Sequence, residues 1–160
     1  STVSALGAQN IGAGKPERAK TTMRYGILIT TCFGLAVVAL MQLYANSFVA
    51  LFTDSSTQDG LQVVTMGGQY LRGYIWDCLF AGMHFCFSGY FCACGRSSLS
   101  FVHNIIAIAL VRIPGVYITS KMFADTLFPM GLATAAGSLL SVMMCLVMYA
   151  ILSRKESKTN

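Results

Sequence analysis

Two long stretches of this chain contain no charged residue, and they constrain its fold more than any other feature. One lies between Arg24 and Asp54, and the other covers Thr126–Ser153. Two more stretches, Gly73–Gly95 and Ser97–Ser120, hold a single interior charge each. A helix needs about 20 mostly apolar residues to cross the hydrocarbon core of a bilayer. The sequence therefore predicts an all-α transmembrane helical bundle. We expect membrane spans at about 23–45, 68–93, 98–120 and 128–152.

The composition excludes several other classes of protein. Hydrophobic residues make up 55% of the 160 residues and charged residues only 11%, whereas a soluble domain carries roughly 25% charged residues. An ordinary soluble globule, a disordered chain and a nucleic-acid binder with a basic surface are therefore excluded. The six cysteines lie inside apolar stretches and lack the spacing of a disulfide framework, so we interpret them as small apolar fillers. The expected surroundings are a lipid bilayer, with no nucleic acid.

The start of the chain resembles neither a mature N-terminus nor a signal peptide. Ser1–Gly14 is small and uncharged, like the end of an earlier helix, and it lacks the basic start and apolar block of a signal sequence. We therefore expect a fragment of a larger membrane protein.

The positive charges predict how the helices are oriented. Counting only Lys and Arg gives 4, 0, 1, 1 and 3 in successive connections. With four crossings, the first, third and fifth connections share a side and hold 8 of these charges, against 1 on the other side. Because positive residues gather on cytoplasmic loops, we expect a multi-pass protein of the cell membrane with a cytoplasmic C-terminus.

Local signals suggest where the helices begin, end and bend. Pro16 suits a first helical turn, and Ser56, three residues before Asp59, resembles another helix start. The first span is expected to end near Tyr44, before a short amphipathic segment in the outer interface. Pro114 should kink the third span. Small residues in the last span predict a close helix contact, at Ala133, Gly137 and Ser141.

Asp77 is the strongest candidate for a functional residue, because a carboxylate at membrane depth is costly and asks for a reason. At about 100° per residue, one face of its helix carries polar or small residues. These are Tyr70, Tyr74, Asp77, Ala81, His84 and Ser88. Such a stripe predicts a water-filled cavity. Two interpretations stay open: Asp77 holds a coupling cation or proton and the substrate's charge in turn, or it is a structural carboxylate that ties two helices together.

Four further residues belong to this hypothesis. Arg112 lies at comparable depth and is the natural partner of Asp77, since an ion pair offsets part of the burial cost of both charges. The ring of Tyr74 could face a cationic compound. His84 and His103 could relay protons, because imidazole titrates near neutral pH, although we expect His103 to be a satisfied structural residue near the cytoplasmic end.

Other chemistry lacks a matching motif. Gly14 and Lys15 resemble the end of a phosphate-binding loop, but Pro16 replaces the required Ser or Thr. The cysteines near His84 show no spacing typical of a zinc site. No loop is long enough for a catalytic site. We expect that the protein binds no metal and no cofactor and that it is not an enzyme.

Four strings, in this order, resemble the C-terminal lobe of the multidrug and toxic compound extrusion (MATE) family of transporters. They are Gly7–Ala19, Leu51-Phe52-Thr53-Asp54, Phe87-Ser88-Gly89-Tyr90-Phe91 and Val111-Arg112-Ile113-Pro114. The resemblance implies the last four helices, and the end of a preceding one, of a twelve-helix fold. It also implies an exporter of organic, usually cationic compounds that is driven by Na+ or H+, with the N-terminal lobe as partner.

The resemblance leaves the coupling ion and the substrate open. Some subfamilies carry an acid deeper in the tenth helix, where this chain has Ala81, and a Gly-rich turn is replaced by Cys92-Ala93-Cys94-Gly95-Arg96. The alternatives are a flippase for lipid-linked oligosaccharides in the same superfamily, a non-transporting membrane subunit, or a membrane-anchored enzyme.

Overall fold

The structure is a computed structural model that describes residues 2–53 and 56–159, with side chains as far as Arg154. In these residues it contains helices and no strand, as the sequence predicts. They are α1 (Thr2–Gly12), α2 (Pro16–Ala50), α3 (Gln58–Ala93), α4 (Ser97–Ala107), a π-helical segment η1 (Ile108–Arg112), α5 (Ile113–Met122) and α6 (Phe128–Thr159). Asp54 and the side chains of Lys155, Glu156 and Lys158, which entered the charge pattern, lie outside the described part.

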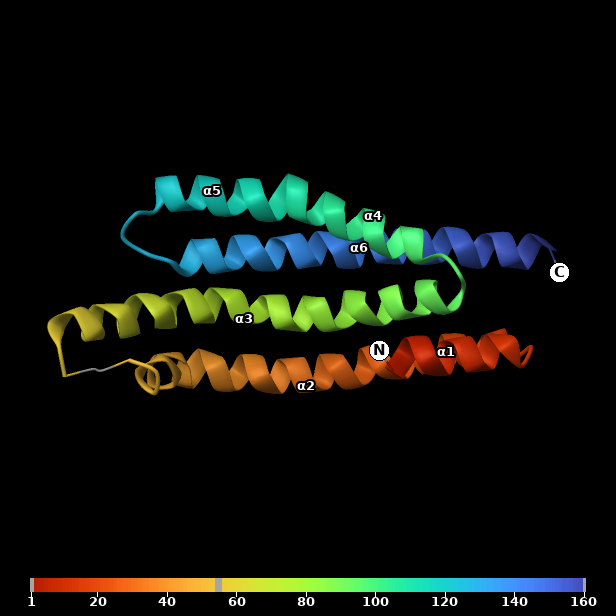
Figure 1. The fold of residues 1–160 in the computed structure, drawn as a ribbon, viewed down its shortest axis with the longest axis horizontal. Coiled ribbons are helices and arrows are strands. Elements are labelled where there is room, and N and C mark those ends of the chain that lie inside the picture. The colour runs from red at the N-terminus through yellow and green to blue at the C-terminus, as the bar shows by residue number, and fades with distance from the viewer. Residues whose placement is uncertain (1, 54–55, 160) are drawn as a thin grey trace.

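The helices form an elongated antiparallel bundle in which α3 lies between α2 and α6 (Figure 1). The run α4–η1–α5 packs on α6, and the short α1 lies beside α2 and α3. The α1–α2 turn, the α3–α4 turn and the end of α6 share one end of the bundle. These are the three connections that the charge pattern assigns to the basic side.

Short sequence signals set the ends of the helices. Pro16 stands in the first turn of α2, as expected. Gly14 and Gly95 end α1 and α3 with φ of 69° and 71°, a left-handed conformation that glycine adopts without steric cost. The expected cap at Ser56 is wrong by one residue, because it is the Thr57 hydroxyl that accepts a hydrogen bond from the Gly60 amide at 3.1 Å.

The helix α2 continues without a break past Tyr44 to Ala50, and the end of the membrane span near Tyr44 stays a prediction. The side chain of Asn46 packs against α3 at Gly68, where an added Cβ would collide with it. Asn46 is exposed and thus contacts α3 from the edge of the same continuous helix.

Two glycines bring α3 and α6 into close contact at the level that positions the site. A Cβ on Gly73 would collide with the backbone of α6 at Phe128, and one on Gly131 with the backbone of α3 at Tyr70. Farther along α6, Gly137 lies against Ala107 and Arg112, as the stripe of small residues predicts. α6 therefore runs close to both α3 and the π-helical segment.

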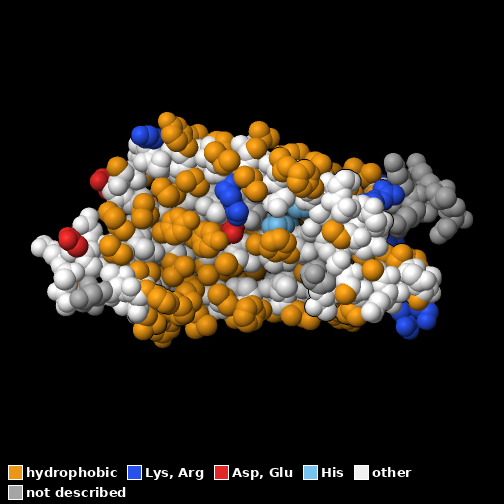
Figure 2. Space-filling model, in the orientation of Figure 1, with side chains coloured by type: hydrophobic (Ala, Val, Ile, Leu, Met, Phe, Trp, Pro, Cys, Tyr) orange, Lys and Arg blue, Asp and Glu red, His pale blue; other side chains and the backbone are white. Residues whose placement is uncertain are grey.

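Three helical segments of the described chain are long and apolar enough to cross a membrane. They are Pro16–Ala50, Ser97–Met122 and Phe128–Arg154. α3 has the length but is more polar, since its inward face carries the polar stripe, and its crossing stays a prediction. Figure 2 shows an extensive apolar surface between the two ends of the bundle.

Candidate ion-coupling site

Midway along the apolar face in Figure 2, an acidic and a basic side chain touch, with histidine beside them. The acid on α3 is Asp77, which is 5% exposed. Its neighbours Ile75 and Leu79 pack against Val38 of α2. Since Asp77 lies about 200° around the helix from each of them, its carboxylate faces the opposite way, toward α6 and η1.

Asp77 is bound by two donors from different helices, both on the same oxygen. Nη2 of Arg112 lies 2.6 Å from Oδ1, and the hydroxyl of Ser138 donates to Oδ1 at 2.6 Å. Nη2 of Arg112 also donates to the Ser138 hydroxyl oxygen at 3.2 Å. The predicted pairing of Asp77 with Arg112 is confirmed. The two partners differ in exposure, because the side chain of Arg112 is 36% exposed and that of Asp77 only 8%.

The π-helical segment presents Arg112 to the site. It occupies the residues just before Pro114, which cannot donate a backbone hydrogen bond. A π turn changes the register of a helix and is frequent at functional sites. The run bends here between α4 and α5 (Figure 1), which agrees with the kink expected at Pro114.

The three side chains open onto a cavity of about 370 Å³ between α3, α4, η1 and α6. Polar groups from all four elements line it: Tyr74, Asp77, Cys78, His84, Asn104, Arg112, Ser138 and Ser141. The predicted stripe therefore does face a cavity, with Ala81 also on its wall.

The structure brings four of the six predicted site residues to this cavity and leaves two aside. Tyr74, Asp77, His84 and Arg112 line it. Tyr70 lies one turn away and stacks on Tyr74, with ring centroids 5.6 Å apart. Ser88 is farther along α3, where its carbonyl accepts a hydrogen bond from Ser100 at 3.1 Å.

Ser138 and Asn104 line the cavity but were missed by reasoning from the sequence. Ser138 directly follows Gly137 of the small-residue stripe, and this proximity was the available signal. Neither residue is distinctive by type, because serine in a membrane helix often bonds only to its own backbone.

The expectation that His103 is a satisfied structural residue is wrong. It is 1% exposed, and neither ring nitrogen has a hydrogen-bond partner in the described part of the chain. Its ring meets that of His84 edge to face, with centroids 5.7 Å apart.

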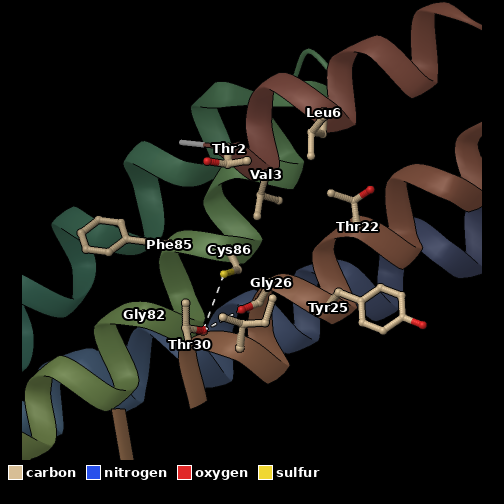
Figure 3. Close-up of a pocket in the computed structure, with 11 residues that line it drawn as sticks. Thr2, Val3, Leu6, Thr22, Tyr25, Gly26, Thr30, Gly82, Phe85 and Cys86 are labelled. Carbon is tan, nitrogen blue, oxygen red and sulfur yellow. Dashed lines mark hydrogen bonds between the residues drawn. The ribbon is translucent and has the colours of Figure 1, made fainter. Parts of the chain in front are cut away.

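A larger, mostly apolar cleft of about 700 Å³ lies on the other side of α3, against α1 and α2. Figure 3 shows Val3, Leu6 and Phe85 around it, and the Tyr25 ring turned outward. No acidic or basic side chain is among the described residues that line it. The cleft therefore offers apolar contact and no charge to a coupling ion.

A model of the MatE family matches residues 1–118 of the chain. The chain belongs to the MatE family. This match confirms the MATE resemblance and, with the apolar helices, makes the chain a membrane transporter of the MATE superfamily, whose members are not enzymes. Searches of curated proteins and of solved structures found no match.

Proposed function

We propose that this MATE chain works as a secondary active multidrug exporter, which moves organic cations out of the cell in exchange for Na+ or H+. The observation that carries the proposal is Asp77, a buried carboxylate that opens onto a polar cavity at membrane depth. Intramembrane acids of this kind commonly mark ion and substrate pathways.

The geometry supports competition for a single carboxylate. In the structure, Oδ1 of Asp77 is occupied by Arg112 and Ser138. A proton or Na+ on Asp77 would replace the charge of Arg112 and release it toward the cavity. An organic cation would compete for the same group, with Tyr74 beside it to contact the cation through its ring. Mutually exclusive binding of this kind couples the two flows.

Charge favours cationic compounds over the phosphate of a lipid-linked oligosaccharide. Among the described residues that line the cavity, the one Lys or Arg is Arg112. Its charge is already neutralised by Asp77. A flippase for a pyrophosphate carrier needs positive charges that are free to bind the phosphates.

The surroundings follow from the same proposal. We expect the basic end of the bundle, with the C-terminus, on the cytoplasmic side of the cell membrane. The remaining half of the transport cavity would come from an N-terminal lobe of the same chain.

Efflux of ethidium, a fluorescent organic cation, tests the proposal in cells that express the full-length protein. Asp77→Asn should lower the efflux rate at least about tenfold, within the range of coupling between two ligands. Asp59→Asn is the matched control, since Asp59 is an exposed acid in the first turn of the same helix. Equal efflux by the wild type and Asp77→Asn at matched expression would reject the proposal.

A further inference from the structure

Two buried histidines lie next to the Asp77 cavity and play no part in its ion pair. His84 on α3 is 5% exposed and His103 on α4 is 1% exposed. Their rings meet at an interplanar angle of 76° with centroids 5.7 Å apart. The pair therefore joins α3 to α4 through two groups that can each hold a proton.

The hydrogen bonding of these rings is incomplete. Nδ1 of His84 and both nitrogens of His103 are buried without a hydrogen-bond partner in the described part of the chain. A buried polar group without a hydrogen-bond partner destabilises the fold, because it has lost its hydration without compensation. Native proteins rarely keep several such groups together, and a functional role is one of the recognised reasons for them.

The cavity connects the pair to Asp77. His84 lines the same cavity as Asp77, and Asn104, the residue after His103, lines it as well. The volume of about 370 Å³ far exceeds the roughly 30 Å³ that a water molecule takes up in the liquid. Along α3, His84 lies seven residues beyond Asp77, about 10 Å at the helical rise, in the direction of the basic α3–α4 turn.

We propose that His84 and His103 form a proton-holding pair that accepts the proton from Asp77 and passes it toward the basic end of the bundle. This inference rests on the proposed antiport and specifies H+ as its coupling ion. The Asp77 carboxylic acid gives up its proton through cavity water and becomes the carboxylate that Arg112 and Ser138 bind. One imidazole takes the proton and becomes an imidazolium, which returns to neutral imidazole when the proton leaves.

The described charged and hydroxyl groups that face the cavity beside the pair come from three elements. Asp77 on α3 and Arg112 on η1 form an ion pair on the wall of the cavity that His84 also lines. α6 faces the cavity with the hydroxyls of Ser138 and Ser141, which carry no charge. Once Asp77 is deprotonated, Arg112 pairs with its carboxylate, and the imidazolium passes its proton toward the basic end of the bundle.

The test uses the full-length protein in liposomes, with ethidium as substrate and an internal pH-sensitive dye to report proton flux. His84→Gln and His103→Gln keep a polar side chain but cannot become charged. Each should slow exchange driven by a pH gradient at least about tenfold, as expected when a proton-transfer group is lost. His103→Gln should still bind ethidium as the wild type does, because His103 is not among the residues that line the cavity. Cys86→Ala is the control, because Cys86 is buried on the same helix but contacts Thr30 of α2.

Each outcome decides between the two proposals. Normal exchange by both glutamine variants, or a wild type driven by a Na+ gradient and not by a pH gradient, would overturn the histidine pair and leave the antiport standing. A wild type that moves no ethidium under either gradient would overturn both. A variant that fails to fold, judged by gel filtration and ethidium binding, is replaced by the corresponding asparagine variant, and the same outcomes apply.

Discussion

The hydroxyl of Ser138 donates a hydrogen bond to Oδ1 of Asp77 at 2.6 Å, and so ties α6 to α3 at the centre of the bundle. Arg112 binds the same oxygen from η1. The carboxylate is thus the point at which three segments of the chain meet. This arrangement serves structure and coupling together, because whatever removes the charge of Asp77 loosens the contacts among all three segments.

Ser138→Ala should destabilise the bundle and shift the coupling equilibrium. It removes one of two donors to a buried carboxylate, which costs about 1.5 kcal/mol, and a proton or Na+ should then compete more easily for Asp77. The measurement is the thermal unfolding midpoint in detergent, with ethidium efflux as a function of pH. Thr134→Val is the control, because within the described residues the Thr134 hydroxyl donates locally, to the Met130 carbonyl. Equal effects of the two variants would contradict a specific role for Ser138.

Arg112→Ala should lower the yield of folded protein more than Asp77→Asn does. Arg112→Ala leaves the buried carboxylate of Asp77 without its cationic partner. Asp77→Asn leaves a neutral amide that still accepts hydrogen bonds. A fully buried pair would lose about 3–5 kcal/mol on removal of one partner; we expect about 2 kcal/mol here because Arg112 is partly exposed. Gel filtration of fluorescent fusions measures the yield. Combining both changes should recover part of the loss, and strict additivity would contradict the pairing.

The ion pair could be predicted from the sequence because charged residues inside apolar stretches are easily recognised and are seldom left unpaired. Asp77 and Arg112 could each be found by inspection, and their comparable depth followed from counting residues along the helices. Ser138 could not be found in this way, because its role depends on how α6 is rotated against α3. That rotation is fixed by the close contact at Gly73 and Gly131.

The histidine contact was beyond sequence reasoning for a related reason. Whether His84 meets His103 depends on the register of α4 against α3, which the short turn at Gly95 determines. The π turn before Pro114 changes the helical register again, so a regular periodicity of 3.6 residues does not give the direction of Arg112. Helical periodicity placed most of the α3 stripe on one cavity wall, and the ion pair followed from charge and depth. The contacts of Ser138 and His103 depend on how two helices pack, which neither signal gives.

Gly131→Ala should separate α6 from α3 and disrupt the site without touching a charged residue. The added methyl group would collide with the α3 backbone at Tyr70 and Tyr74, which cannot move as a flexible side chain would. Overpacking of this kind costs about 3 kcal/mol. The unfolding midpoint in detergent should fall clearly below that of Gly12→Ala, the control at a glycine with no neighbour within 4 Å. Equal midpoints for the two variants would contradict the close crossing.

Reporter fusions should place the basic end of the bundle in the cytoplasm. The three connections at this end together hold 8 Lys and Arg residues, and the two connections at the other end hold 1. Such a bias sets membrane orientation because basic loops resist translocation. Alkaline phosphatase, which is active only outside the cytoplasm, should therefore be inactive after Asn160 and active after Thr57. A green fluorescent protein at the same two positions is the control and should show the reverse pattern. Activity of a phosphatase fused after Asn160 would show that the bundle has the opposite orientation. The histidine pair would then lie toward the outside and could not deliver protons inward.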